Sequence, residues 1–311
     1  MTRHLLTLND WSAEAIEEII AHGLYIKHHR SEFAQAMAGR TLLMLFEKPS
    51  LRTRVSFETG MEQMGGHAIY YDVSTSPMGK GKESIADVAR TVSRYVDIIM
   101  ARTYEHTTIE ELAHYATVPV INGLSNFSHP CQILGDLMTL KEKKGTLAGL
   151  KLAYLGDAHN NVTHSLLFAC PKVGMHISIG CPAGPKYEPL PDVLASARAA
   201  AQATGVSVDV HHQPEAAVDG ADVVYTDSWM SYHIPEDERQ ERFAALGPFQ
   251  VTSDLMKRAK PDAVFMHCLP AQRGVEQTAE VIDGPQSIVF DQAENRLHIQ
   301  KAIILKLMGR L

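Results

Sequence analysis

A short segment around residue 50 carries the side chains best suited to chemistry. Ser50, Arg52, Thr53 and Arg54 follow an apolar run at 42–46 and precede a helical pattern of apolar and acidic residues. A helix that begins here would bring free backbone N–H groups, the positive end of its dipole and two guanidinium groups to one place. Such a place binds a phosphate or a carboxylate. The alternative is a solvated pair of arginines, but the dipole disfavours cations there, which favours a bound anion.

The elements around this segment alternate between short apolar runs and longer helical patterns. Runs typical of buried strands lie at 42–46, 68–71, 98–101, 119–121, 152–155, 176–179, 206–210, 223–226, 264–267 and 287–290. Helical patterns lie at 84–95, 108–115, 129–143, 162–173, 192–203 and 253–259. This alternation predicts an α/β fold with doubly wound parallel sheets that helices cover on both faces.

The length of 311 residues favours two domains. A helix that ends at Lys143-Lys144 is followed by Gly145, a typical helix stop, and this predicts a boundary near 145. The first domain is expected at 1–145 and the second at 146–291. No strand follows the last helix, at 294–308, so residues 292–311 are expected to return to the first domain.

Polar side chains collect just after the predicted strands of both domains. They are Ser50, Arg52, Thr53, Arg54, Arg102, Thr103, Asn122, the segment 129–132, the segment 156–161, the segment 227–231, the segment 267–270, Asp291, Gln292 and the segment 294–296. Ligands of α/β sheets bind beyond the carboxyl ends of the strands. The sequence therefore predicts an active site in a cleft between the domains, cationic on the first side and lined by amides and carboxylates on the second.

Composition excludes several classes of protein. A hydrophobic content of 45% and a charged content of 21% are typical of a globular protein with a large core. The net charge of −7 argues against general binding of nucleic acid. No apolar run reaches the roughly 20 residues of a membrane span, and the first residues do not form a secretory signal. The cysteines form no C-x-x-C pair, so reduced thiols and a cytoplasmic location are expected.

Familiar cofactor and metal motifs are missing. The segment 156–161 does not match the G-x-G-x-x-G dinucleotide fingerprint, and the chain has no G-x-x-x-x-G-K-[ST] phosphate loop. These absences disfavour a dehydrogenase and a nucleotide hydrolase. The 16 histidines include no H-E-x-x-H spacing, and the pairs at 28–29 and 211–212 are typical of the surface, so no metal site is expected.

At this point the motifs resemble a known family, the aspartate/ornithine carbamoyltransferases. Residues 50–54 resemble its S-x-R-T-R motif, and 129–132 (His-Pro-Cys-Gln) resemble its H-P-x-Q motif. Residues 267–270 (His-Cys-Leu-Pro) resemble the H-C-L-P motif of the ornithine branch, and 291–296 are similar to the closing motif of that branch. The motifs occur in the order of the family, each after a predicted strand, and the resemblance covers essentially the whole chain.

The resemblance implies transfer of a carbamoyl group from carbamoyl phosphate to an amine, in a homotrimer or multiple of trimers that shares active sites between subunits. It implies no metal and no organic cofactor. The residues implied for carbamoyl phosphate are Ser50, Leu51, Arg52, Thr53, Arg102, His129, Gln132, Cys268, Leu269 and Arg296, with Lys80 from a neighbouring subunit. Those implied for ornithine are Asn161, Asp227, Ser231, Tyr232 and Cys268. The catalytic set is Arg52, Arg102, His129, Asp227 and Cys268.

The chemistry of this reaction agrees with these residue types. A tetrahedral centre gains negative charge on its oxygen while phosphate departs, and positioned cations and polar donors stabilise both charges. Only the neutral amine of the acceptor attacks, although the free ammonium has a pKa near 10. We expect Cys268 and Asp227 to orient that amine. No covalent intermediate with the protein is needed, because holding two reactants in line already lowers the barrier.

Each of the second-domain residues also has a purely structural interpretation. Cys268 could be an inert core thiol, as free cysteines often are. Asp227 could be a plain helix cap, and Asn160-Asn161 could be turn residues. Cys131 is expected in the core, facing away from His129. In register with the family motifs, Asp227, Asn161 and Cys268 are better interpreted as site residues.

The chain departs from the pattern of the family in several places. Ser231 is followed by Tyr232-His233, where the ornithine branch usually has Ser-Met-Gly, so acceptor choice or closing motion could differ. The loop 74–84 lacks an expected glutamine near 78, and Lys80 or Lys82 could supply a cation there instead. The other interpretation is a solvated basic loop. Leu51 stands where threonine is common, at a position expected to contribute its backbone N–H.

Other functions remain open on the sequence. The acceptor could be putrescine, N-acetylornithine or aspartate, although Asp227 favours an acceptor with a free α-amino group and an aspartate-binding motif is missing. A binding or regulatory protein that kept the fold is disfavoured, because such a protein need not keep the whole set of site residues. The sequence does not decide between arginine synthesis and breakdown.

Overall fold

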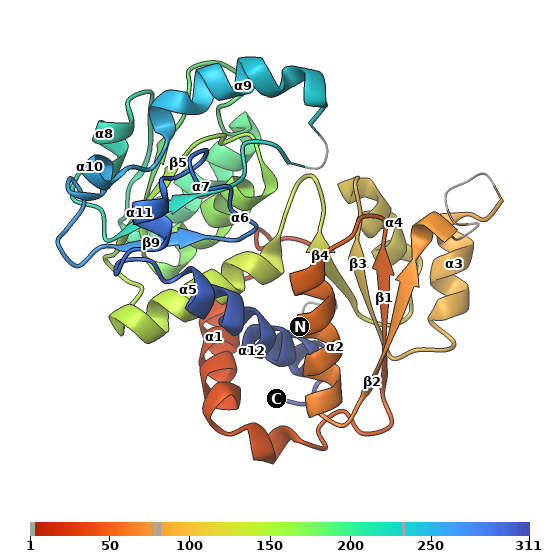
Figure 1. The fold of residues 1–311 in the computed structure, drawn as a ribbon. Coiled ribbons are helices and arrows are strands. Elements are labelled where there is room, and N and C mark those ends of the chain that lie inside the picture. The colour runs from red at the N-terminus through yellow and green to blue at the C-terminus, as the bar shows by residue number, and fades with distance from the viewer. Residues whose placement is uncertain (1–3, 76–77, 79–81, 232–233) are drawn as a thin grey trace. The chain divides into compact units, whose positions relative to one another are not determined.

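The computed structural model describes residues 4–75, 78, 82–231 and 234–311 of the chain (Figure 1). These residues fold into two compact units, one comprising Met1–Met138 and Glu294–Leu311, the other Thr139–Ala293. Each unit contains its own sheet, and every strand pair in both sheets is parallel. The prediction of an α/β fold with parallel-sheet domains is therefore confirmed.

The first unit is built on a four-stranded sheet with the order β2-β1-β3-β4. Its strands are β1 (Thr41–Phe46), β2 (His67–Asp72), β3 (Ile98–Arg102) and β4 (Val120–Leu124), and its helices include α1 (Ala13–His28), α2 (Leu51–Gln63), α3 (Ile85–Val92) and α4 (His106–Tyr115). Inside the sheet, β1 pairs with both β2 and β3. A strand covered on both faces must be apolar throughout, which is why residues 42–46 read as one continuous run.

The second unit contains a five-stranded sheet with the order β7-β6-β5-β8-β9. Its strands are β5 (Lys151–Leu155), β6 (His176–Gly180), β7 (Val208–His211), β8 (Val223–Thr226) and β9 (Val264–His267). Its helices include α6 (Asn161–Ala169), α7 (Pro191–Thr204), α8 (Pro214–Val218), α9 (Arg239–Leu246), α10 (Ser253–Met256) and α11 (Ala279–Ile282). β5 leads into α6, and β8 and β9 lead into loops, so the carboxyl ends of neighbouring strands present these segments at one edge of the sheet.

The chain passes from one unit to the other within α5 (Pro130–Lys144) and within α12 (Val289–Leu307). The C-terminal part of α12 belongs to the first unit, as predicted for the last helix. Lys301 Nζ donates to Gln63 of α2, and Lys306 Nζ pairs with Glu18 of α1. A Cβ added at Gly60 of α2 would lie 3.6 Å from Lys301 Cγ, an ordinary van der Waals distance, so α12 packs directly against this face of α2.

The predicted strand at 287–290 is wrong. Ser287 makes only an isolated bridge to Phe265 of β9, and helix α12 begins at Val289. Ile288 and Val289 are buried, whereas Phe290 is 71% exposed. A run of a few apolar residues does not distinguish a strand from the first turn of a buried helix, and here the helix forms.

The other predicted runs each overlap a strand, with ends that differ by a few residues. The helical patterns of the sequence do not include α1, α8, α9 or α11. Within the described part of the chain, no helix combines the length and the apolar character that a membrane span requires.

Candidate active site

The turn between β1 and α2 has the local structure that an anion site requires. Ser50 is the N-cap of α2, and its side chain accepts a hydrogen bond from the backbone N–H of Thr53 at 3.3 Å. Thr53 is buried and Arg52 is half-buried. The Leu51 side chain is 74% exposed, so the backbone of this residue is the part available for binding. The predicted helix start is therefore confirmed, with its first N–H groups at the end of β1.

Arg54 does not join this site, contrary to the expectation that two guanidinium groups converge here. Its Nε donates to Glu58 Oε1 at 3.0 Å, one helical turn later. Its guanidinium also lies 3.8 Å from the centre of the Tyr70 ring. Successive helix positions point about 100° apart, so Arg52 and Arg54 face different sides of α2.

Polar residues from separate strands and helices of the first unit meet next to this turn. Arg102 ends β3, His129 precedes α5, Gln132 lies in its first turn, and Arg296 lies on α12. Arg296 donates to Gln132 Oε1 and, at 3.5 Å, to Thr53 Oγ1. Thr53, Gln132 and Arg296 are thereby held together, although they lie far apart in the sequence.

The imidazole of His129 lies in this cationic environment. Burial lowers the pKa of His129 well below its ordinary value, and the nearby charges of Arg296, Arg102 and Lys48 lower it further. The ring is therefore neutral at neutral pH. A neutral imidazole donates a hydrogen bond from one nitrogen and accepts one at the other. It can polarise a carbonyl group without adding another positive charge.

Sequence reasoning missed Lys48. Its side chain is 2% exposed, and its Nζ lies 4.9 Å from the centre of the Tyr104 ring. Burial lowers the pKa of Lys48 to about 8, the neighbouring Arg102 lowers it as well, and Glu47 and Glu105 oppose the shift. A signal was present, because Lys48 lies between the end of a buried strand and a predicted anion site, where a side chain has little solvent around it.

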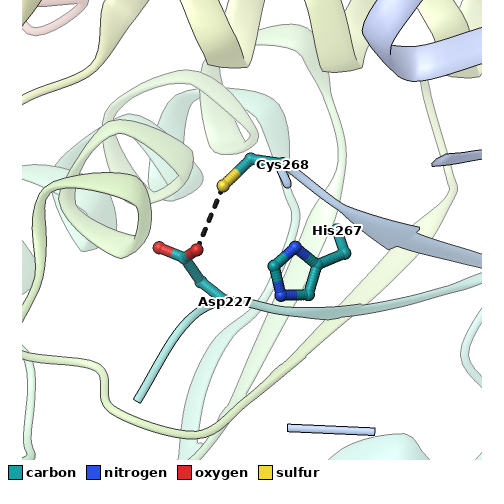
Figure 2. Close-up of side chains that lie close together, drawn as sticks. All are labelled: Asp227, His267 and Cys268. Atoms are coloured by element: carbon teal, nitrogen blue, oxygen red, sulfur yellow. Dashed lines mark hydrogen bonds between the residues drawn. The ribbon is translucent and has the colours of Figure 1, made fainter. Parts of the chain in front are cut away.

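In the second unit, Asp227 and Cys268 face one another at the ends of adjacent strands (Figure 2). Thr226 of β8 pairs with His267 of β9, so the next residue of each chain segment emerges at the same edge. The Cys268 thiol donates to Asp227 Oδ1 at 3.0 Å, and the Ser228 N–H donates to the same oxygen at 2.7 Å. Burial raises the pKa of Asp227, while these two hydrogen bonds lower it and the charge of Asp157 raises it.

His267 shapes the turn that follows β9. Its backbone N–H donates to Gln292 Oε1 at 3.0 Å, and its ring Nδ1 accepts from the Leu269 N–H at 2.9 Å. Leu269 adopts a φ of 59°, a left-handed conformation that a leucine rarely takes. Such local strain is typical of functional sites, where the surrounding structure enforces it.

Asp227, His267 and Cys268 each offer an atom that could bind a metal ion, and these atoms lie within 4.8 Å of one another. The hydrogen bonds disfavour this use. The Nδ1 lone pair of His267 is engaged by a backbone N–H, and the Cys268 thiol keeps its proton while it donates to Asp227. Because Nδ1 accepts this bond, the neutral ring carries its proton on Nε2. A metal would have to displace either that proton or the Leu269 bond, and take the thiol proton as well.

The remaining predicted acceptor residues lie on neighbouring loops. Asn160, not Asn161, is the N-cap of α6, because its Oδ1 accepts from the Thr163 N–H at 2.9 Å. Asn161 is the first residue of the helix and is half-buried, and Ser231 is also half-buried. Tyr232 and Lys80 lie outside the described residues. Cys131 is buried in the first unit, as expected.

Comparison with known proteins bears on both units. The carbamoyl-phosphate-binding domain model of the aspartate/ornithine carbamoyltransferases matches residues 3–142, and the aspartate/ornithine-binding domain model of the same family matches residues 148–307.

Individual relatives match along the whole chain. An anabolic ornithine carbamoyltransferase of Pyrococcus furiosus is 52% identical over 309 residues, which are 99% of this chain and 96% of that protein. A solved structure of ornithine carbamoyltransferase from the same organism is similar with a TM-score of 0.94 at 51% identity, over 99% of this chain and 97% of that one. A solved N-acetyl-L-ornithine transcarbamylase has a TM-score of 0.89 at 32% identity, over 98% and 99% of the two chains. With both domain models matched in order and a full-length relative at this identity, the chain belongs to the aspartate/ornithine carbamoyltransferase family.

Proposed function

We propose that this protein transfers the carbamoyl group of carbamoyl phosphate to the δ-amine of L-ornithine and releases L-citrulline and phosphate. The observation that carries the proposal is the division of chemistry between the units. The first unit gathers buried cations around a helix N-terminus, and the second presents a buried carboxylate bonded to a thiol. The first set suits a phosphate and a carbonyl oxygen, and the second suits an amino acid with a free ammonium group.

The first unit would bind carbamoyl phosphate. Its phosphate is proposed to lie at the N-terminus of α2, where Ser50, the Leu51 N–H, Arg52 and Thr53 donate, with Arg102 nearby. The carbonyl oxygen is proposed to accept from His129, Gln132 or Arg296. Pre-arranged donors of this kind stabilise the charge that develops on that oxygen in the transition state. Lys48 would add a positive charge near Arg102.

The second unit would bind ornithine. The Asp227 carboxylate is suited to the α-ammonium, with Asn161, Ser231 and Tyr232 contacting the rest of the amino acid. Cys268 and Leu269 lie after β9, where the δ-amine and the carbamoyl group are proposed to meet. The neutral δ-amine forms a bond to the carbonyl carbon, the bond from carbon to the phosphate oxygen breaks, and the departing phosphate takes the proton that the amine loses. Catalysis then consists of positioning and charge stabilisation.

We propose the same division for the domains: residues 1–145 with 292–311 bind carbamoyl phosphate, and residues 146–291 bind ornithine. A homotrimer with Lys80 reaching a neighbouring site is part of the proposal. It is supported by the family resemblance and by exposed apolar side chains on α2 and the edge strand β2, among them Leu51, Val55, Ile69 and Tyr71. The cysteines are all free thiols, which supports a cytoplasmic location. The anabolic relative supports a role in arginine synthesis.

The test is phosphate release from carbamoyl phosphate with ornithine, N-acetylornithine, putrescine and aspartate supplied in parallel. We expect release with ornithine, matched by an equal amount of citrulline. Release with another amine alone would keep the mechanism and reject ornithine as the acceptor. No release with any of them would reject the proposed reaction. Arg52→Ala serves as the inactive control.

A further inference from the structure

Trp229 lies in the loop after β8, between Asp227 and Ser231, and buried charged side chains lie next to its backbone polar groups. Arg242 Nε donates to the Trp229 carbonyl at 2.9 Å. Burial raises the pKa of Glu276, and the nearby backbone N–H of Trp229 is one of the groups that lower it. Arg242 is 4% exposed and Glu276 is 3% exposed. In an ordinary surface loop these peptide groups would be solvated, whereas here a buried guanidinium fixes the carbonyl and a buried carboxylate lies near the N–H.

The same guanidinium reaches a second loop of the proposed acceptor site. Arg242 forms a buried ion pair with Asp157, which follows β5. Asp157 Oδ1 accepts from the His159 N–H at 2.9 Å, and Asn160 Nδ2 donates to the Asp157 carbonyl at 2.6 Å. This segment leads directly to Asn161. A single side chain therefore connects the loop of Asp227 and Ser231 with the loop of Asn161.

The packing around Arg242 encloses this connection. Its guanidinium lies 5.4 Å from the centre of the Tyr187 ring, and Tyr187, Trp229 and Leu246 form a buried apolar cluster. The Tyr187 carbonyl accepts from the Ala158 N–H at 2.9 Å, which holds the same segment again. Removing a buried ion pair from water costs free energy, so its presence here is weak evidence for a stabilising role.

We propose that Arg242 is a positioning residue for the amine acceptor, with Glu276 as its counterpart on the N–H side of Trp229. Arg242 fixes the Trp229 carbonyl and so sets the geometry of Asp227 and Ser231 relative to Asn161. This inference rests on the proposed function. A misplacement of about 1 Å in a binding constellation can cost about a hundredfold in rate. The effect should fall on the acceptor, since none of these contacts involves the carbamoyl phosphate residues of the first unit.

The test compares a double variant, Asp157→Asn with Arg242→Met, against Arg242→Lys. The double variant removes the guanidinium without leaving an uncompensated buried carboxylate, and asparagine keeps an oxygen for the His159 N–H. Lysine keeps the charge but cannot make both contacts. Glu276→Gln tests the other side of Trp229 with little change of shape. Arg239→Met is the matched control, since Arg239 lies on the same helix and forms an exposed pair with Glu236.

Steady-state kinetics are measured with each substrate varied while the other is saturating, and thermal unfolding is recorded alongside. We expect the double variant to raise the KM for ornithine about tenfold, with a smaller rise for Arg242→Lys and Glu276→Gln. The KM for carbamoyl phosphate should stay within about twofold, and Arg239→Met should match wild type. In Arg242→Ala, added guanidinium should restore part of the affinity for ornithine.

A purely structural role would lower the unfolding temperature or the active fraction, and so kcat, without moving the KM for ornithine. That result in the Arg242 and Glu276 variants would overturn the inference while the proposed function stood. Equal rises in both KM values would overturn it as well. A wild-type protein without ornithine turnover would instead overturn the proposed function, and this inference with it.

Discussion

Replacing His129 with asparagine is expected to make the folded protein less sensitive to acid. Burial and the charges of Arg296, Arg102 and Lys48 hold the pKa of His129 well below its ordinary value. In the unfolded chain this histidine titrates near pH 6.5. Between these two pKa values the unfolded state binds more protons than the folded state. Stability therefore falls as the pH drops below about 6.5, until the folded pKa is reached.

The size of this effect follows from proton linkage. When folding lowers the pKa of a group, the protein loses up to about 1.4 kcal/mol of its free energy of unfolding for each pH unit below the unfolded pKa of that group. Between pH 7.0 and pH 5.5, a histidine that stays neutral in the folded state accounts for about 1.3 kcal/mol. In a unit of this size that corresponds to about 3–5 °C of melting temperature. Burial also lowers the pKa of His106 and lowers that of His298 to about 4. On acidification, the wild-type protein should therefore lose more stability than His129 alone accounts for.

The assay is thermal unfolding at pH 7.0 and pH 5.5 for wild type, His129→Asn and the exposed control His28→Asn. The quantity compared is the loss of melting temperature on acidification, so any change of absolute stability cancels. His129→Asn should lose about 3–5 °C less than wild type. An acid-induced loss as large as that of wild type would refute the neutral, buried state of His129.

Further expected results concern the proposed reaction. Arg52→Ala should abolish detectable turnover, because a charge-assisted phosphate contact is lost; rates near wild type would reject the assignment. Cys268→Ala should move the acid limb of kcat/KM for ornithine to higher pH, because the thiol bond that lowers the pKa of Asp227 is lost; an unmoved limb would count against an ionised Asp227 in acceptor binding. In wild type, the KM for carbamoyl phosphate should rise above about pH 8 as Lys48 loses its charge. Lys48→Met should raise this KM at every pH and flatten that rise, and an unchanged profile would show that Lys48 does not act on the substrate.

Local sequence patterns were sufficient to predict those features of the structure that depend on residues close together in the chain. Residues 42–46 are apolar because β1 is covered on both faces, and Ser50 caps α2 because a serine oxygen can accept a free N–H at a helix start. The sequence did not predict that β8 pairs with β9. It predicted only that polar residues after the strands lie at one edge of the sheet. Its register, Thr226 with His267, is what places Asp227 beside Cys268.

Sequence reasoning failed where a side chain had several possible partners. Arg54 looked equivalent to Arg52, but Glu58 and Tyr70 engage it on another face of α2. Both asparagines at 160–161 could have capped α6, and the structure selects Asn160. The run 287–290 could have been a strand or a helix, and burial of Ile288 and Val289 at the start of α12 decided it.

By itself, the sequence determined the α/β class, the alternation of elements and the positions of the residues suited to bind an anion and an amine, because periodicity and helix capping act within a few residues. The tertiary structure alone decided which of those residues meet. Thr53, Gln132 and Arg296 come together through the packing of α12, and Arg242 reaches Asp157 and Trp229 from a helix that the pattern did not reveal. Burial also shifted the pKa values of Lys48, His129 and Asp227, since desolvation depends on the surroundings of a group and not on its neighbours in the chain.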